Sequence, residues 1–171
     1  HSFPTRRSSD LLATALQKLR GSVAYGRAER ELDFVAVCLI GYERPVPIEI
    51  GSNATRWPVK VTTSRDPASA AKRPDLEQPL HSLVCLEYVW TASDAHARRL
   101  KAALDTMLVG EDEAMTSLRH SWRDCADPAI AWGVLLSDAL RALREKGEII
   151  EAFSEDMKVQ KILNHARRKL G

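Results

Sequence analysis

Three segments with strand-like apolar patterns constrain the fold of this chain more than any other feature. Residues 34–40 form a nearly continuous apolar run, which is typical of a strand that is covered on both faces. Residues 58–63 alternate Val59 and Val61 with polar side chains, as a half-buried strand does. Residues 82–90 are rich in β-branched and aromatic side chains, which favour strands. Together these segments predict a small antiparallel sheet of three strands.

Helical signals fill the intervals between and after these segments. Asp66 and Pro67 are the residue types expected of an N-cap and a first helical position, and they predict a short helix. Ser93 is a second N-cap, and the apolar residues after it recur at helical spacing. Ser137 and Ser154 predict the starts of two further helices. We therefore expect an α+β fold, in which helices flank a three-stranded antiparallel sheet and further helices lie at the N- and C-terminal ends.

The sequence divides into four predicted segments. Residues 1–11 resemble a sequencing adapter translated in frame, so we interpret them as a non-native tail and exclude them from fold arguments. Residues 12–31 are predicted to form an N-terminal helix followed by a polar linker that begins at Gly21. Residues 32–150 hold the predicted sheet domain, and residues 151–171 form a C-terminal amphipathic helix.

The charge balance does not by itself indicate a nucleic-acid partner. The chain has 25 lysine and arginine residues against 23 aspartate and glutamate residues, and without the adapter-like tail these counts become 23 and 22. Charge this close to neutrality lacks the strongly basic signature of many nucleic-acid-binding proteins. No apolar run approaches the roughly 20 residues of a membrane helix, so we expect no membrane partner and a cytoplasmic location.

The cysteine and histidine patterns do not predict a metal site or a disulfide framework. The three cysteines, Cys38, Cys85 and Cys125, contain no Cys-x-x-Cys pair. Two of them lie in predicted strands, where a buried free thiol is usual. Outside the tail, no two histidines have the four-residue spacing that places zinc ligands on one helix face.

Short motifs accompany the predicted strands in a recognisable order. An apolar strand is followed by Pro-x-Lys-Val, then by Asp-Pro at a helix start, then by another strand and a helix with Ala-x-x-Leu. The residues that carry this order are Pro58, Lys60, Val61, Asp66, Pro67, Ala97, Leu100, Leu104 and Trp132. The arrangement resembles the GIY-YIG nuclease superfamily in its phage-like form, whose second signature reads Lys-Ile-Gly. The resemblance implies a three-stranded antiparallel sheet flanked by helices over residues 32–150.

The resemblance also implies chemistry on phosphodiesters. GIY-YIG nucleases use a strand tyrosine, an arginine on the first helix, and a glutamate on a later helix that holds a divalent metal. A metal or a perturbed tyrosine activates the attacking water. A fixed guanidinium stabilises the negative charge that grows on the phosphate.

The reactive positions hold different residues in this chain. The glycine of the Lys-Ile-Gly signature corresponds to Thr62, whose branched side chain hinders the approach of a phosphate to the backbone. The helix arginine corresponds to Ala70, and the metal-binding glutamate corresponds to Lys101, which would repel a divalent cation. We therefore expect a nuclease-like domain with a degenerate active site and no metal cofactor, which binds nucleic acid or a protein partner without cutting.

Two other functions are compatible with the sequence. An active endonuclease would need catalytic groups at shifted positions, for which Tyr42, Arg65 and Asp105 are the candidates, with magnesium as cofactor. Asp105 follows Lys101 by one helical turn and so lies on the same face. Alternatively, the chain is an unrelated α+β interaction domain in which the motif order arises by chance.

Basic side chains near the motifs are the candidates for contact with a nucleic-acid backbone. Such contacts tolerate changes of nucleic-acid sequence and weaken as salt rises. A solvated helix face explains the cations at positions 98–101 without any ligand. The predicted nucleic-acid-binding residues are Lys60, Arg65, Lys72, Arg73, Arg98, Arg99 and Lys101.

Overall fold

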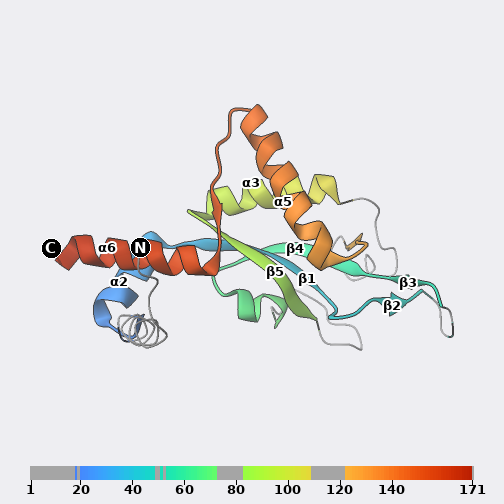
Figure 1. The fold of residues 1–171 in the computed structure, drawn as a ribbon, viewed down its shortest axis with the longest axis horizontal. Helices are drawn as coiled ribbons and strands as arrows, with labels where there is room; N and C mark the ends of the chain where they lie inside the picture. Colours follow the sequence, from blue (N-terminus) through green and yellow to red (C-terminus); the bar gives the residue numbers. More distant parts are fainter. Residues whose placement is uncertain are drawn as a thin grey trace, which may run out of the picture. The chain divides into compact units, whose positions relative to one another are not determined.

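The chain folds into two compact units in the computed structural model, whose elements are labelled in Figure 1. One unit comprises His1–Asp33 with Glu155–Gly171, and the other comprises Phe34–Ser154. Each unit has buried apolar residues of its own. The structure describes residues 18, 20–48, 51, 53–72, 83–108 and 122–170.

The larger unit is built on a five-stranded antiparallel sheet with the strand order β6-β4-β1-β5-β7. The predicted α+β fold is confirmed, but the predicted total of three strands is wrong. A strand of two residues extends the sheet at each edge, and two residues are too few to show an alternating pattern in the sequence. The strands are β1 (Val35–Gly41), β4 (Pro58–Ser64), β5 (Val84–Thr91), β6 (Arg123–Asp124) and β7 (Ala152–Phe153).

Strand β1 lies at the centre of the sheet, and all seven of its residues are buried. Successive side chains of a strand point to opposite faces. Val37 and Leu39 accordingly belong to the hydrophobic cluster on one face, whereas Cys38 and Ile40 belong to the cluster on the other. A strand covered on both faces explains the continuous apolar run in the sequence.

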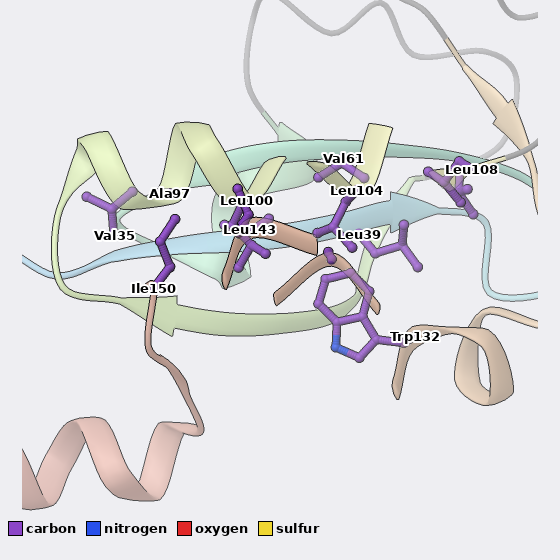
Figure 2. Packing of buried hydrophobic residues seen from close by; sticks show 13 residues of the cluster. Val35, Leu39, Val61, Ala97, Leu100, Leu104, Leu108, Trp132, Leu143 and Ile150 are labelled. Atoms are coloured by element: carbon purple, nitrogen blue, oxygen red, sulfur yellow. The ribbon is translucent and has the colours of Figure 1, made fainter. Parts of the chain in front are cut away.

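Two helices cover the first face of the sheet. They are α3 (Asp94–Met107) and α5 (Pro128–Glu145), which also pack against each other (Figure 1). Figure 2 shows Leu104 of α3 in the same cluster as Leu39 and Trp132. Full burial of one leucine side chain contributes roughly 1.5–3 kcal/mol to stability. Because this cluster contains several buried leucines, it stabilises the packing of the two helices on the sheet.

The two helices differ in how well the sequence predicted their starts. The Ser93 hydroxyl caps α3 by accepting a hydrogen bond from the His96 N–H at 3.2 Å, which confirms the predicted start. The start of α5 predicted at Ser137 is wrong, because Asp127 caps this helix and Pro128 is its first residue. The first turns of α5 expose apolar side chains, and this breaks the amphipathic pattern on which helix prediction relies.

A short 3-10 helix, η1 (Pro67–Lys72), covers the second face of the sheet. In Figure 1 it is the green helix on the opposite side of the strands from α3 and α5. Asp66 precedes it as predicted, and its carboxylate accepts a hydrogen bond from the Ser69 hydroxyl at 2.7 Å. Ala70 and Ala71 of η1 are buried with Trp90 in the cluster on this face.

A second, two-stranded sheet pairs β2 (Val46–Pro47) with β3 (Thr55–Arg56). Trp57 follows β3 and links this region to β6. The Trp57 N–H donates to the Asp124 carboxylate at 3.1 Å, and the Trp57 carbonyl accepts from the Cys125 N–H at 3.0 Å. These bonds hold the short edge strand β6 beside the start of β4.

The smaller unit pairs two helices, α2 (Val23–Leu32) and α6 (Glu155–Leu170). The linker predicted to begin at Gly21 is wrong, since α2 occupies most of that segment. Only Tyr25 and Ala28 of α2 are buried, so its apolar stripe is too narrow to predict a helix from periodicity. On α6, the buried residues include Ile162, Leu163 and Ala166.

Glu31 links the two helices of the smaller unit. Its Oε2 atom lies 2.8 Å from His165 Nε2 and 3.5 Å from Lys169 Nζ. The hydrogen bond with His165 is the main cause that lowers the pKa of Glu31 below its ordinary value, and the charge of Lys169 adds to this effect. Partial loss of solvent acts in the opposite direction and is outweighed.

Gly41 ends β1 at a point where β4 passes very close to it. A Cβ atom at Gly41 would lie 2.8 Å from the carbonyl oxygen of Pro58 and 3.0 Å from Leu86 Cδ1. Because the nearer atom belongs to the backbone, it cannot move aside without disturbing the sheet. Gly133 of α5 is the opposite case, since nothing lies within 4 Å of its Cβ position.

We expect Gly41→Ala to destabilise the chain by about 1–3 kcal/mol, because the added methyl group overlaps the Pro58 carbonyl. Gly133→Ala, measured in dilute solution, is the matched control, and it should stabilise the single chain by about 0.5–1 kcal/mol through helix propensity. Chemical denaturation followed by circular dichroism measures both changes. Equal effects of the two substitutions would contradict the close approach at Gly41.

Glu31 should also give the stability of the chain a dependence on acid pH. Its pKa is lower in the folded chain than in the unfolded chain, so the ionised carboxylate stabilises the fold above the unfolded-state pKa. This contribution is lost as the pH falls through the folded-state pKa. We expect Glu31→Gln to be less stable than wild type near neutral pH and to converge with it in acid. Thermal unfolding across pH measures the difference; Glu29→Gln, an exposed carboxylate on the same helix, is the control. Parallel pH curves for Glu31→Gln and wild type would contradict the linkage.

Candidate functional site

Three of the positions predicted from the nuclease resemblance share the face of the sheet that η1 covers. Lys60 and Thr62 alternate on β4 with Val61, which belongs to the cluster on the α3 face. Thr62 pairs with Cys38 of β1 and is only 7% exposed. Ala70 is fully buried in the cluster on the same face. At the position that the resemblance matches to the nuclease arginine, this chain therefore has a buried methyl group, which cannot contact a phosphate.

Lys101 lies in the other layer of the larger unit. It is on α3, whose Leu100 and Leu104 pack against the first face of the sheet. Its ammonium lies 2.7 Å from Asp105 Oδ2, and both side chains are 36% exposed. An exposed pair of this kind contributes only about 0.3–0.5 kcal/mol to stability. The pair also affects metal binding, because the Lys101 ammonium offsets the negative charge of Asp105, the carboxylate that the sequence suggested as a metal ligand.

The candidates for a shifted active site, Tyr42, Arg65 and Asp105, do not converge. Strands β1 and β4 are antiparallel, with Ala36 opposite Ser64, so Arg65 lies beside the start of β1. Tyr42 follows the other end of β1. Six residues of extended strand separate these two ends by roughly 20 Å. Asp105 is on α3, in the layer that η1 does not occupy.

The carboxylates do not form a magnesium site in the described part of the larger unit. Among the residues that the structure describes, no three His, Cys, Asp or Glu side chains come close enough to hold a metal ion. Asp105 is engaged with Lys101 instead. The metal that an active nuclease would require thus has no ready ligand set among these residues.

The predicted nucleic-acid-binding cations do not form one patch. Those near β4 and η1 belong to one side of the sheet, and those on α3 belong to the other. On α3, Arg98 Nε lies 2.9 Å from Asp94 Oδ2, which offsets its charge. Arg73 lies outside the described residues. The two groups are Lys60 and Lys72 on the η1 side, with Arg65 just after the end of β4, and Arg98, Arg99 and Lys101 on α3.

Arg99 lines a groove between α3 and α5 with a volume of about 290 Å³. A second cation, Lys146 at the end of α5, lines the same groove, and sequence analysis did not single it out. The floor includes Ala102 and Ala142, whose small side chains keep the groove open, and Glu148 adds one negative charge. The groove can therefore accept an anionic group of modest size.

Helix α5 presents an exposed apolar face that sequence analysis missed. Ile130 is 74% exposed and Val134, one turn later, is 62% exposed. Between them lies Gly133, which has open space where a side chain would be. The buried residues of α5, which include Trp132 and Ala139, lie on its other side. In the sequence, this face is indicated only by Ile130 and Val134, two β-branched residues that fall outside the helical repeat of the buried side chains.

Tyr42 lines a hollow of about 450 Å³ at the turn that follows β1. Its backbone carbonyl accepts a hydrogen bond from Trp57 Nε1 at 2.8 Å, which fixes the turn against the segment before β4. The lining is largely apolar, with one acid and one base at the rim. The other residues of the hollow are Glu43, Arg44, Pro45, Val46, Pro47 and Val84.

No protein family profile, curated protein or solved structure matches the chain. Within the described ranges, no helix is long and apolar enough to cross a membrane.

Proposed function

We propose that residues 34–154 form a GIY-YIG-like domain that does not cut nucleic acid and instead binds a protein partner. The exposed apolar face of α5, formed by Ile130, Gly133 and Val134, is the observation that carries this proposal. The order of elements supports the likeness to the nuclease family: two antiparallel strands, a short helix opened by Asp-Pro, a third strand and a capped helix.

The residues at the reactive positions support the absence of cleavage. Ala70 offers no positive charge to a phosphate, and its burial leaves no room for a ligand at that point. Lys101 stands where the family has its metal-binding glutamate, and it is paired with Asp105. Phosphodiester hydrolysis needs both an activated water and stabilisation of the developing charge, and neither position supplies its part.

We expect the purified chain to leave supercoiled plasmid intact with Mg²⁺ or Mn²⁺, because its carboxylate and guanidinium positions are lost. Agarose electrophoresis with and without the metal measures nicking, and Arg65→Ala is the variant to compare. Metal-dependent nicking that Arg65→Ala abolishes would overturn the proposal in favour of an active endonuclease.

A second candidate function is nucleic-acid binding. It is favoured by the two cations, Arg99 and Lys146, that line the groove between α3 and α5. In the same agarose gels, binding would slow the migration of the plasmid at low salt. A shift that weakens with salt and disappears in Arg99→Glu/Lys146→Glu would support this candidate. Arg98→Glu is the matched control, since Arg98 is already paired with Asp94. If both charge-reversal variants lose the shift equally, the groove has no special part in it.

For the protein partner we propose a second copy of this chain, with α5 packed antiparallel against α5. A pair that crosses near Gly133 places Ile130 of each copy level with Val134 of the other. The missing side chain at Gly133 lets the two helix axes approach closely, so that the side chains on either side interdigitate. Such an interface is isologous, because each copy contributes the same residues.

The charges along α5 complement this arrangement. The segment before and at the start of the helix carries the acidic Asp124 and Asp127. Near its end the exposed face carries Arg144 and also Arg141, whose charge is partly offset by its ion pair with Asp138. An antiparallel partner brings the basic end of one copy toward the acidic end of the other. A single helix pair buries less surface than a standard interface, so we expect a weak, concentration-dependent dimer.

We expect wild type to dimerise in sedimentation velocity runs at rising concentration, and Ile130→Glu or Val134→Glu to raise the dissociation constant at least about tenfold. Each substitution replaces an apolar contact worth roughly 1.5–3 kcal/mol with a buried charge. Ile149→Glu is the matched control: Ile149 is 78% exposed but lies beyond α5. It should leave the dissociation constant unchanged.

Two results would count against the self-association. One is a wild-type chain that stays monomeric at every concentration reached. The other is an equal rise in the dissociation constant for Ile149→Glu and Ile130→Glu, which would indicate nonspecific hydrophobic association rather than a defined interface. Circular dichroism of each variant checks that a loss of association does not come from unfolding.

A further inference from the structure

Cys38 and Cys85 lie on adjacent strands and face the same side of the sheet. Cys38 is on β1 and belongs to the cluster on the η1 face, and Cys85 of β5 packs against that cluster. Cys85 is directly opposite Ile40, whose side chain belongs to the cluster on the same face as Cys38. The two cysteines are therefore diagonal neighbours across a strand pair, on the same face of the sheet.

The ladder between β1 and β5 is irregular at this point. Leu39 is opposite Glu87, yet the next residue, Ile40, is opposite Cys85, so β5 has an extra residue there. A bulge of this kind loosens the local ladder and bends the strand. The Cys38 thiol lies near enough to influence Cys85, and Cys85 Sγ donates a hydrogen bond to the Glu87 carbonyl oxygen at 3.5 Å. The backbone adjustment that a covalent bond would require thus falls where the ladder is already irregular.

We propose that Cys38 and Cys85 form a redox-active dithiol, which hydroperoxides oxidise to an intrachain disulfide. Cys85 is half-buried and acts as the attacking thiol, whereas Cys38 is fully buried and acts as the resolving thiol. The inference concerns a modification site and does not depend on the proposed protein partner.

The reaction proceeds in two steps. The Cys85 thiolate attacks one oxygen of the hydroperoxide, the O–O bond breaks, and the second oxygen leaves as an alcohol, or as water from hydrogen peroxide, after taking up a proton. Cys85 is then a sulfenic acid. The Cys38 sulfur attacks the Cys85 sulfur, the S–O bond breaks, and the hydroxyl leaves as water with the Cys38 proton. The two thiols lose two electrons and the peroxide gains them.

The electrostatics of the three cysteines favour this order of events. The hydrogen bond from Cys38 is the main cause that lowers the pKa of the Cys85 thiol, and it outweighs burial and the charge of Glu87. The pKa of Cys125 is raised instead, mainly by burial and also by the charges of Asp124 and Asp127. Because the thiolate is the nucleophile, Cys85 should react well before Cys125. Cys125 thus serves as an internal reference.

The test uses the full chain, reduced and then treated with hydrogen peroxide. We expect its intact mass to fall by about 2 Da, with one thiol left for iodoacetamide and full reversal by dithiothreitol. Peptide mapping should join Cys38 to Cys85. Cys125→Ser should keep the loss of mass, whereas Cys38→Ser should lose it and accumulate sulfinic acid at Cys85.

A measurement on wild type keeps the proposal testable if Cys38→Ser does not fold. Before oxidation, iodoacetamide should modify Cys85 at least about tenfold faster than Cys125, as expected for a more populated thiolate. Three results would overturn the proposal. They are an unchanged mass after peroxide, a linked peptide that contains Cys125, and equal rates of alkylation at Cys85 and Cys125.

Discussion

The burial of β1 on both faces is the constraint on which the larger unit depends. Its seven buried residues bind β4 and β5 through the backbone, while their side chains divide between two clusters. Residues next to each other in the sequence therefore contribute to different layers. The same division separates the positions inferred from the nuclease resemblance, since Ala70 is in the η1 layer and Lys101 is in the α3 layer. Positions that belong to one order of motifs along the sequence therefore lie in two different layers of the fold.

The sequence predicted those parts of the fold whose local pattern agrees with their burial. The three long strands have apolar or alternating residues, and Ser93 caps α3 as expected. The edge strands β6 and β7 have only two residues each, so backbone pairing rather than side-chain pattern defines them. Helix α2 escaped prediction because it buries little against a single partner helix, and the start of α5 did so because its first turns expose apolar side chains.

The candidate site was less predictable, because it depends on register and layering. The sequence alone shows that Thr62 and Ala70 replace the residues of the nuclease motif. The ion pair between Lys101 and Asp105 becomes visible only once α3 is formed. The distance between Tyr42 and Arg65 depends on how β1 pairs with β4. The cysteines show the same limit. Each reads as an isolated buried thiol, and only the bulge between β1 and β5 makes two of them neighbours.

The exposed face of α5 is hard to explain by the stability of the chain on its own. A glycine within a helix costs about 0.5–1 kcal/mol relative to alanine, and at Gly133 no neighbouring atom requires it. Ile130 and Val134 are β-branched, which is unfavourable in a helix, and neither gains burial in return. Three such choices fall within five residues on one face. Local choices that contradict the fold are expected where a sequence serves a second requirement, and a helix that packs against these residues supplies one.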